Sequence, residues 1–453
     1  MARLIFDIET DGLLDACTKI HCLCIQDEQS GKTWSCSDHP GYTPISEGLR
    51  RLAEAELIIG HNIIKFDLPA IRKIHPGWET KAKIRDTLLC TRLIWPDIAD
   101  SDYARIKAKK QFPARLIGRH SLEAWGWRIR DHKGDFGKTT DWQTWCKEMQ
   151  DYCEQDVAVT SALWAHIQLQ KYSEESIELE HDFQFILWKQ EQNGFPFDKG
   201  RAIELYSELS ARREQLSCEL RQLYPPKIVR ETFIPKRDNK TKGWTAGVPV
   251  IKTKEIPFNP ASRQQIAERL IQQGWKPENY TDTGHPVVDE NALAMLHTPE
   301  TDALREYLMI EKRIGQLAEG QNAWLKLERD GKIHGEVITN GAVTGRCTHN
   351  RPNMAQIPAV GSPYGEQCRS LFGPPEGWVQ IGCDASGLEL RCLAHYMAAY
   401  DGGAYAQVIL HGDIHTENQK AAGLETRAQA KRFIYAFLKC KGLRVGIHVD
   451  NRP

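Results

Sequence analysis

The sequence predicts a mixed α/β domain at the start of the chain, followed by a mainly helical region. Within the first 175 residues, short apolar runs of strand length alternate with segments of helical period. From residue 176 to residue 223 the pattern is helical. A chain of 453 residues also exceeds the size at which one hydrophobic core keeps growing, so two to four domains are expected.

Each element follows from its local pattern. We expect strands at residues 4–8, 20–26, 57–59 and 379–384, a turn at Asp11-Gly12, and helices that begin near Asp67 and span 149–167. The helical region should break at Asn193-Gly194-Phe195-Pro196 and continue as a long charged helix over Lys199–Leu223. The change of pattern predicts a domain boundary near residue 175.

Composition excludes few functions. The net charge of −1 is uninformative about nucleic acid, because residues 224–260 hold eight Lys or Arg against three acids and 105–119 form another basic run. A solvated loop is the alternative for each run. No apolar run reaches membrane-span length, so we expect a cytoplasmic protein of a bacterial host cell with no membrane partner. The cysteines should be reduced, with Cys22 and Cys24 on opposite faces of a strand.

Four acids indicate a metal site. Asp7 and Glu9 are two apart on a strand, so their side chains share a face and repel each other unless a divalent cation neutralises them. Asp67 follows the strand at 57–59, although a helix cap is a strong alternative. Asp156 lies four residues after Tyr152, which places phenol and carboxylate on one helix face.

In this order, D-I-E-T, H-N-x-x-x-F-D and Y-x-x-x-D resemble the DEDDy family of 3′-to-5′ exonucleases, which has an RNase H-like fold. The resemblance implies two Mg²⁺ ions, for which Mn²⁺ can substitute. It implies these roles: Asp7 bridges both metals, Glu9 and Asp156 hold the first, Asp67 reaches the second through water, and Tyr152 orients the attacking water. Asp86 is explained well enough as a helix cap before Leu88.

The last third of the chain contains further candidate residues. Asp384 ends the strand expected at 379–384 and could hold a metal, with an N-cap as the alternative. Arg427, Lys431 and Tyr435 are spaced four apart on an apolar helix, so two cations and a ring share one face. Such a face suits the binding of a triphosphate. The alternative is an exposed amphipathic helix that binds no ligand. The Gly/Pro-punctuated segment around Thr344-Gly345-Arg346 is unsuited to a core.

Almost the whole chain resembles the family A DNA polymerases, most closely the T-seven type of short-tailed bacteriophages. The resemblance rests on the ordered motifs D-I-E-T, N-G-F-P-F-D, T-G-R, P-N-x-x-Q-I-P, D-A-S-G-L-E-L-R, G-D-I-H-T and R-x-x-x-K-x-x-x-Y. It implies that Asp384 is one of two palm carboxylates and that the Ala385 carbonyl is a further metal ligand. The other implied roles are a 2′-position contact by Glu389, triphosphate contacts by His415, Arg427 and Lys431, stacking by Tyr435, and primer minor-groove contacts by Arg346 and Gln356.

Two features depart from that family. The family continues after its R-x-x-x-K-x-x-x-Y motif with Tyr-Gly and later a His-Asp-Glu motif that supplies the second palm carboxylate, whereas residues 439–453 read differently and His448-Val449-Asp450 has the wrong order. We therefore expect the exonuclease activity to survive and polymerisation to be lost. Whether this chain binds a dNTP stays open. The segment 224–260 is shorter than the insertion that captures thioredoxin in that family, so thioredoxin stays open as a partner.

The expected domains are an RNase H-like exonuclease at 1–175, a mainly helical thumb at 176–330 with a basic tip at 224–260, a partial palm at 331–400, partial fingers at 401–438 and a divergent tail at 439–453. DNA is the expected partner, as single-stranded 3′ ends and primer-template. The tip residues expected to touch phosphates are Lys236, Arg237, Lys240 and Lys242. Three functions stay open: a replicative polymerase of a phage or prophage with a proofreading exonuclease, a stand-alone exonuclease, and a non-enzymatic DNA-binding remnant of a prophage.

Overall fold

The computed structural model describes residues 2–108, 111–131, 140–281, 283–296 and 298–439. The chain divides into two compact units, Met1–Pro375 and Glu376–Pro453. The tail at 440–453, with His448-Val449-Asp450, lies outside the described residues.

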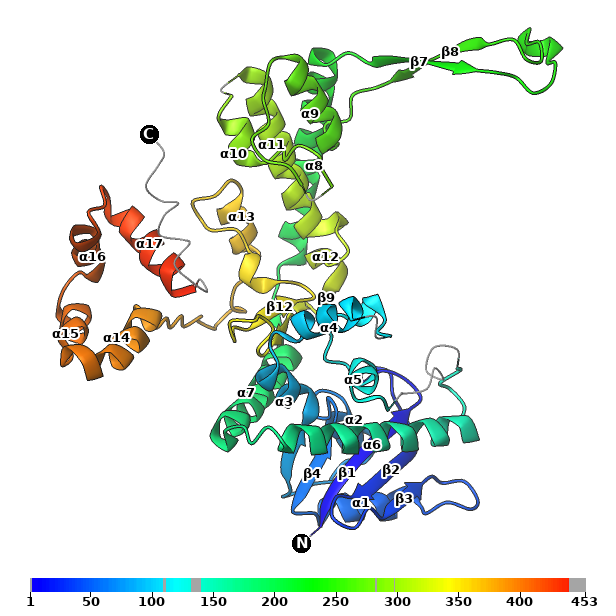
Figure 1. Ribbon diagram of the computed structural model, residues 1–453, viewed down its shortest axis with the longest axis vertical. Coiled ribbons are helices and arrows are strands. Elements are labelled where there is room, and N and C mark those ends of the chain that lie inside the picture. Colours follow the sequence, from blue (N-terminus) through cyan, green and yellow to red (C-terminus); the bar gives the residue numbers. More distant parts are fainter. Residues whose placement is uncertain (1, 109–110, 132–139, 282, 297, 440–453) are drawn as a thin grey trace. The chain divides into compact units, whose positions relative to one another are not determined.

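The first unit begins with a five-stranded sheet in the order β3-β2-β1-β4-β5 (Figure 1). Its strands are β1 (Arg3–Thr10), β2 (Ile20–Asp27), β3 (Thr33–Cys36), β4 (Leu57–Gly60) and β5 (Lys83–Asp86). β2 pairs antiparallel with both β1 and β3, whereas β4 pairs parallel with β1 and β5. The β1–β4 ladder spans only Arg3 to Ile5, so the end of β1 lies beyond its parallel neighbour.

Helices cover both faces of this sheet. They are α1 (Ile45–Ala53), α2 (Asp67–Ile74), α3 (Thr87–Ile94), α4 (Ile98–Lys107), α5 (Leu122–Ile129) and α6 (Lys147–Gln168). Leu4, Phe6 and Ile8 of β1 pack in a core with α1 and α2, whereas Ile5 packs with α5 and α6. The period of two along β1 therefore sends Asp7 to the α6 side, where the Cys153 thiol donates to its carbonyl at 3.4 Å.

A second core joins most of the remaining helices of this unit. These are α8 (Lys199–Leu223), α9 (Arg263–Gln272), α10 (Glu290–Ala294), α11 (Pro299–Ile314), the π-helical η4 (Gly315–Glu319), α12 (Trp324–Leu327) and α13 (Gly365–Ser370). The intervening α7 (Glu174–Asn193) instead packs through Ile177 in the core with α5 and α6. Buried leucines and isoleucines of α8, α9 and α11 form the centre of this core. The predicted break between α7 and α8 is confirmed, because Gly194 ends α7 with φ of +63°.

Short strands complete the first unit. β6 (Phe195–Pro196), β10 (Lys332–Ile333) and β9 (Glu328–Arg329) form a three-stranded sheet, and β11 (Glu336–Ile338) pairs antiparallel with β12 (Thr348–Asn350). Thr344-Gly345-Arg346 lies in the loop between β11 and β12, as its composition suggested. Single-turn 3₁₀ segments occur at η1 (Ala114–Leu116), η3 (Lys240–Lys242) and η5 (Met354–Gln356).

The basic segment 224–260 is not the solvated loop named as its alternative, because it contains a β-hairpin. β7 (Lys227–Phe233) pairs antiparallel with β8 (Val250–Ile256) over seven residues each. The strands are rich in β-branched residues, which favour extended structure, and the Gly and Pro residues of the segment all lie outside the two strands. Near the tip, Lys252 Nζ lies 3.8 Å from the centroid of the Phe233 ring and 4.7 Å from that of Trp244.

The second unit has an irregular described segment at 376–387, followed by helices. It contains α14 (Leu388–Asp401), α15 (Ala404–His411), α16 (Ile414–Ala422) and α17 (Arg427–Lys439). The strand predicted at 379–384 is wrong, because these residues are irregular and exposed, with Ile381 88% exposed. An apolar run forms a strand only when a neighbour pairs with it, and none among the described residues does so here.

The early elements are confirmed at β1, β2, β4, α2 and α6. The expectation that Cys22 and Cys24 occupy opposite faces is wrong, since residues two apart on a strand share a face, and both pack against α6. The described cysteines are unpaired thiols, most of them buried. Over the described part of the chain, no helix is both long and apolar enough to cross a membrane.

Candidate active site

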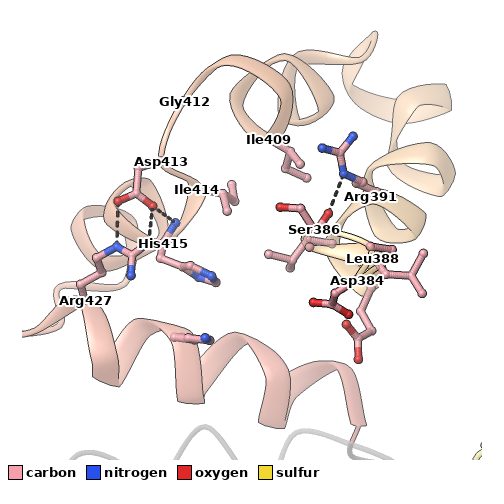
Figure 2. A pocket seen from close by; sticks show the side chains of 15 residues that line it. Asp384, Ser386, Leu388, Arg391, Ile409, Gly412, Asp413, Ile414, His415 and Arg427 are labelled. Carbon is pink, nitrogen blue, oxygen red and sulfur yellow. Dashed lines mark hydrogen bonds and ion pairs between the residues drawn. The ribbon is translucent and has the colours of Figure 1, made fainter. Parts of the chain in front are cut away.

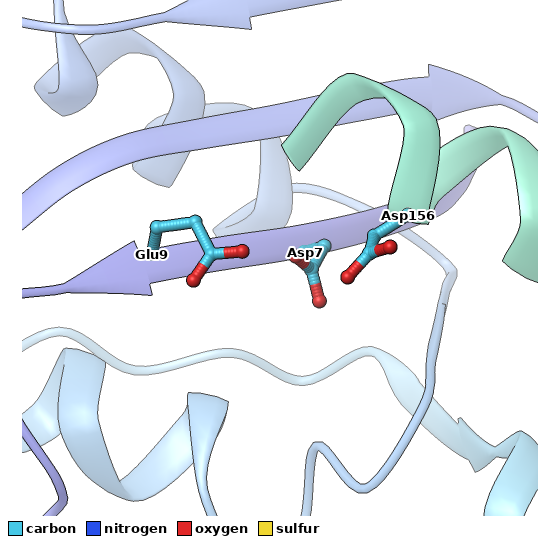
Figure 3. Close-up of side chains that lie close together, drawn as sticks. All are labelled: Asp7, Glu9 and Asp156. Atoms are coloured by element: carbon cyan, nitrogen blue, oxygen red, sulfur yellow. The ribbon is translucent and has the colours of Figure 1, made fainter. Parts of the chain in front are cut away.

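Three carboxylates meet at the junction of β1 and α6. Ligand oxygens of Asp7, Glu9 and Asp156 all lie within 4.8 Å of one another, and Figure 3 shows the three side chains converging. Asp156 is buried and the other two are half-buried. Oxygen ligands at this separation fit a divalent cation such as Mg²⁺, which binds carboxylates at about 2 Å. The structure describes no other cluster of three such ligands.

Asp67 lies next to this cluster. It is the first residue of α2 and is 4% exposed. Its Oδ1 accepts the backbone N–H of Ile8 at 3.3 Å, between the two β1 acids. The N-cap position of α2 is Phe66 and Asp67 is the first helical residue, so the alternative of Asp67 as the N-cap is wrong. The β1–β4 ladder ends at Ile5, so β4 does not reach the Ile8 N–H. The Asp67 carboxylate accepts from this N–H instead.

Asp86 confirms the expectation of a helix cap and also holds the loop before Asp67. Its Oδ1 caps α3 by accepting from the Leu88 N–H at 3.0 Å. The same carboxylate accepts from the N–H of Asn62 at 2.8 Å and of Ile64 at 3.2 Å. Asn62 has φ of +66°, a left-handed conformation that Asn tolerates better than most residues. Asp86 therefore shapes the loop that delivers Asp67.

Burial governs the charge of these two acids. Burial, together with the nearby Asp86 and Asp156 carboxylates, raises the pKa of Asp67 to about 7, although the Ile8 N–H acts to lower it. Burial likewise raises the pKa of Asp86 to about 6, against the lowering effect of its three N–H donors. Negative charge is therefore costly at Asp67 without a cation, as is usual for a site built around a metal.

Tyr152 lies one helical turn before Asp156 on α6 and is half-buried. Its ring packs edge-on against Trp142, with centroids 6.4 Å apart. The phenol and the Asp156 carboxylate leave the same side of α6, as the spacing predicted. The structure thus brings together the acids predicted at this site, with the tyrosine on the helix that carries one of them.

The second unit contains a cavity of about 680 Å³. Its lining includes most of the residues predicted to bind nucleotide or metal in this part of the chain: Asp384, Ala385, Glu389, His415, Arg427 and Lys431 (Figure 2). They come from the segment before α14, from α14 itself, and from α16 and α17. Tyr435 lies on α17, but its side chain is outside the described residues.

Asp413 is a member of this cavity to which the sequence assigned no role. Its carboxylate accepts from Arg427 Nε at 2.8 Å and Nη2 at 3.1 Å (Figure 2), and it caps α16 by accepting from the His415 N–H at 3.1 Å. The Arg427 guanidinium is the largest cause of a lowered pKa of Asp413. Burial, followed by Arg427, lowers the pKa of His415. The position of Asp413 before a helix was the available signal.

The remaining predicted residues are exposed on the first unit. Arg346 lies in the β11–β12 loop, and Gln356 ends the turn η5, where its carbonyl accepts from Gln316 at 3.3 Å. The basic tip residues are all exposed between β7 and β8: Lys236, Arg237, Lys240 and Lys242. Lys242 Nζ also lies 4.9 Å from the Trp244 ring centroid.

Comparison with known proteins identifies the family. A model of DNA polymerase family A matches residues 239–439. The chain is 39% identical to the DNA-directed DNA polymerase of Escherichia phage T7 over 96% of this chain and 75% of that protein, and equally similar to its counterpart in Enterobacteria phage T3. The polymerase domain of Pol1 from M. smegmatis, solved with DNA primer-template and dNTP, shares the fold with a TM-score of 0.63 and 18% identity, over 95% of this chain and 67% of that one. The chain therefore belongs to the family A DNA polymerases, and within them to the phage T7 type.

Proposed function

We propose that the first part of this phage-type family A polymerase is a metal-dependent 3′-to-5′ exonuclease that removes nucleotides from single-stranded DNA ends during proofreading. The observation that carries the proposal is the convergence of Asp7, Glu9 and Asp156 within 4.8 Å, with Asp67 bonded to the strand between the first two. A complete acid set favours an enzyme over a remnant that only binds DNA.

Each residue of this proposed site has its own role in metal binding or in orienting water. Bound Mg²⁺ would supply an activated water and stabilise the leaving oxygen of the phosphodiester. Asp7 would help to hold both ions, Glu9 and Asp156 would help to hold the first, and Asp67 would help to hold the second. Tyr152, on the same helix face as Asp156, would orient the attacking water. The edge-on contact with Trp142 limits the freedom of the Tyr152 ring.

Digestion of an end-labelled single strand tests the proposal. With Mg²⁺ or Mn²⁺ we expect mononucleotides to be released from the 3′ end, because the acid cluster needs a cation to act. Chelation of the metal should stop the reaction, and renewed Mg²⁺ should restore it. Release from the 5′ end, or digestion that persists in excess chelator, would contradict the assignment.

The cavity of the second unit supports a nucleotide-binding role. We propose that His415, Arg427 and Lys431 contact a triphosphate, that Glu389 crowds the 2′ position, and that Asp384 and the Ala385 carbonyl bind metal. The bidentate pair between Asp413 and Arg427 holds this guanidinium at the cavity wall. We propose a stacking role for Tyr435, and primer minor-groove contacts for Arg346 and Gln356. The division at residues 175, 330, 400 and 438 into exonuclease, thumb, palm and fingers belongs to the same proposal.

The β7–β8 hairpin supports a separate grip on duplex DNA. Reversal of all four tip charges (Lys236, Arg237, Lys240 and Lys242 to Glu) should weaken binding to primer-template by at least tenfold at low salt, since each lost phosphate contact removes counterion release. It should also reduce the dependence of log Kd on log salt concentration. Fluorescence anisotropy across a salt series measures both effects.

Digestion of a short single strand should change less than twofold in this variant, because the exonuclease acids are untouched. The control variant reverses four exposed lysines elsewhere in the unit: Lys32, Lys81, Lys171 and Lys189. Equal loss in both variants, or equal effects on duplex and single strand, would show that the hairpin is not a distinct grip.

A further inference from the structure

Lys65 occupies an unusual position in the loop before α2. Its Nζ lies 2.8 Å from Glu191 Oε2, in the last turn of α7, and 2.7 Å from Glu336 Oε1, the first residue of β11. The three side chains are 19%, 24% and 25% exposed, so this ionic cluster is largely shielded from water. Neither acid belongs to the segment that carries the exonuclease motifs. One cation thus joins that segment to two later elements of the chain.

The loop itself leads directly to an exonuclease acid. Asp86 fixes its start through the N–H groups of Asn62 and Ile64. Lys65 lies at its other end, two residues before Asp67, whose Oδ1 bonds to β1. The side chain of Ile64, next to Lys65, is itself buried at 2% exposure. The position of the Asp67 carboxylate therefore depends on both ends of the loop, and only Lys65 supplies the second anchor through a charge.

The charges make this anchor sensitive to substitution. If Lys65 were neutral, Glu191 and Glu336 would face each other without the cation, and repulsion between half-shielded carboxylates would push the loop, α7 and β11 apart. If Glu336 alone were neutral, the pair of Lys65 with Glu191 would remain. Neutralising Lys65 and neutralising Glu336 should therefore both loosen the Asp67 loop, and the change at Lys65 should have the larger effect.

A second ion pair provides a natural comparison. Arg329 Nη1 lies 2.5 Å from Asp15 Oδ2 and joins the same two regions of the unit. These side chains are 53% and 74% exposed, and Asp15 lies in the turn after β1 rather than in the loop before Asp67. Loss of this pair removes an attachment between the regions in which no residue of the Asp67 loop is a partner.

We propose that Lys65 is a positioning residue for the exonuclease acid Asp67, and that Glu191 and Glu336 hold it in place from outside the exonuclease segment. The proposal rests on the proposed exonuclease function, because it concerns one of that site's acids. It makes the metal affinity of the exonuclease depend on α7 and β11. Residues that hold metal ligands in place usually change metal affinity about 10- to 100-fold when lost.

The test is a Mg²⁺ titration of single-strand digestion by residues 1–453. Lys65→Met should raise the half-saturating Mg²⁺ concentration about tenfold, as is usual when a residue that holds a metal ligand in place is lost. Lys65→Arg should restore it to within about threefold, because Arg keeps the charge, and Glu336→Gln should give a smaller rise than Lys65→Met. Arg329→Met should leave it within about twofold of wild type. Thermal melting of each variant shows whether it is folded.

The outcomes separate the two proposals. A lower maximal rate at unchanged half-saturating Mg²⁺ in both Lys65→Met and Glu336→Gln would mean that the cluster only stabilises the fold, and would overturn the positioning role. An equal shift in Arg329→Met would also overturn it. The proposed exonuclease function would be compatible with both results, provided that Asp67→Asn still raises the half-saturating Mg²⁺ concentration. Absence of digestion by the wild-type chain would instead remove the proposed function itself. If Lys65→Met does not fold, Glu336→Gln alone decides the question.

Discussion

Replacement of Asp7 and Glu9 together by Ala is expected to abolish 3′-end degradation of single-stranded DNA, with a rate loss of about a thousandfold or more. Metal stabilisation of a phosphodiester reaction contributes several kcal/mol, and each 1.4 kcal/mol is about tenfold in rate. The two substitutions remove two of the three carboxylates that meet within 4.8 Å. A 5′-labelled oligonucleotide with Mg²⁺, followed on a denaturing gel, measures the loss.

The fold should survive this change. Neighbouring carboxylates repel each other in the absence of metal, so their removal should leave the melting temperature of the metal-free protein unchanged or raise it. Glu148→Ala with Asp151→Ala is the matched control, because it removes two exposed acids from α6 outside the cluster. We expect wild-type digestion from the control. Digestion by Asp7→Ala/Glu9→Ala at the control rate would rule out this site as the source of the activity.

The polypeptide of residues 1–453 is expected not to extend a primer. Nucleotidyl transfer needs one metal to activate the primer hydroxyl and another to stabilise the departing pyrophosphate, and two palm carboxylates position both. Asp384 lines the cavity of the second unit, and the resemblance to family A assigns the other carboxylate to a His-Asp-Glu motif that these residues do not contain. The expected loss is several orders of magnitude.

Primer extension in the Asp7→Ala/Glu9→Ala background, which prevents re-digestion, measures this prediction. Binding of a labelled dNTP to the same protein in the presence of primer-template separates loss of binding from loss of chemistry. Templated extension by the purified polypeptide would contradict the prediction. Extension that appears only when a second polypeptide with the His-Asp-Glu motif is added would show that the two halves of the metal clamp can assemble from separate chains.

The sequence predicted those parts of the fold in which a local pattern and the final packing agree. β1, β2 and the break between α7 and α8 follow from alternation, helical period and the Gly-Phe-Pro interruption. The two β1 acids of the proposed exonuclease site could be found because residues two apart on a strand share a face. The failures have a common cause: the β7–β8 hairpin forms through pairing between distant strands, and residues 379–384 stay irregular without such pairing.

Side-chain contacts between distant segments were harder still to predict. Nothing in the sequence indicates that Lys65 meets Glu191 and Glu336, since surface charges of both signs are common throughout the chain. Asp67 was ambiguous between a cap and a ligand because its sequence context suits both. Only the fold shows that its carboxylate accepts from Ile8. Asp413 likewise gains its contact with Arg427 from the packing of α16 and α17.

The bond between Asp67 and the backbone of Ile8 bears on how this site tolerates sequence drift. The donor is a main-chain N–H, which 19 of the 20 amino acids supply equally, so the contact does not depend on the side chain at position 8. The Ile8 side chain is 3% exposed and packs in the core with α1 and α2, on the face of β1 away from Asp7. Its volume therefore affects the packing of that core. Position 8 can thus exchange one apolar residue for another while the acid keeps its partner, and proline alone would remove the donor. Selection for packing and selection for chemistry act there on different atoms of the same residue.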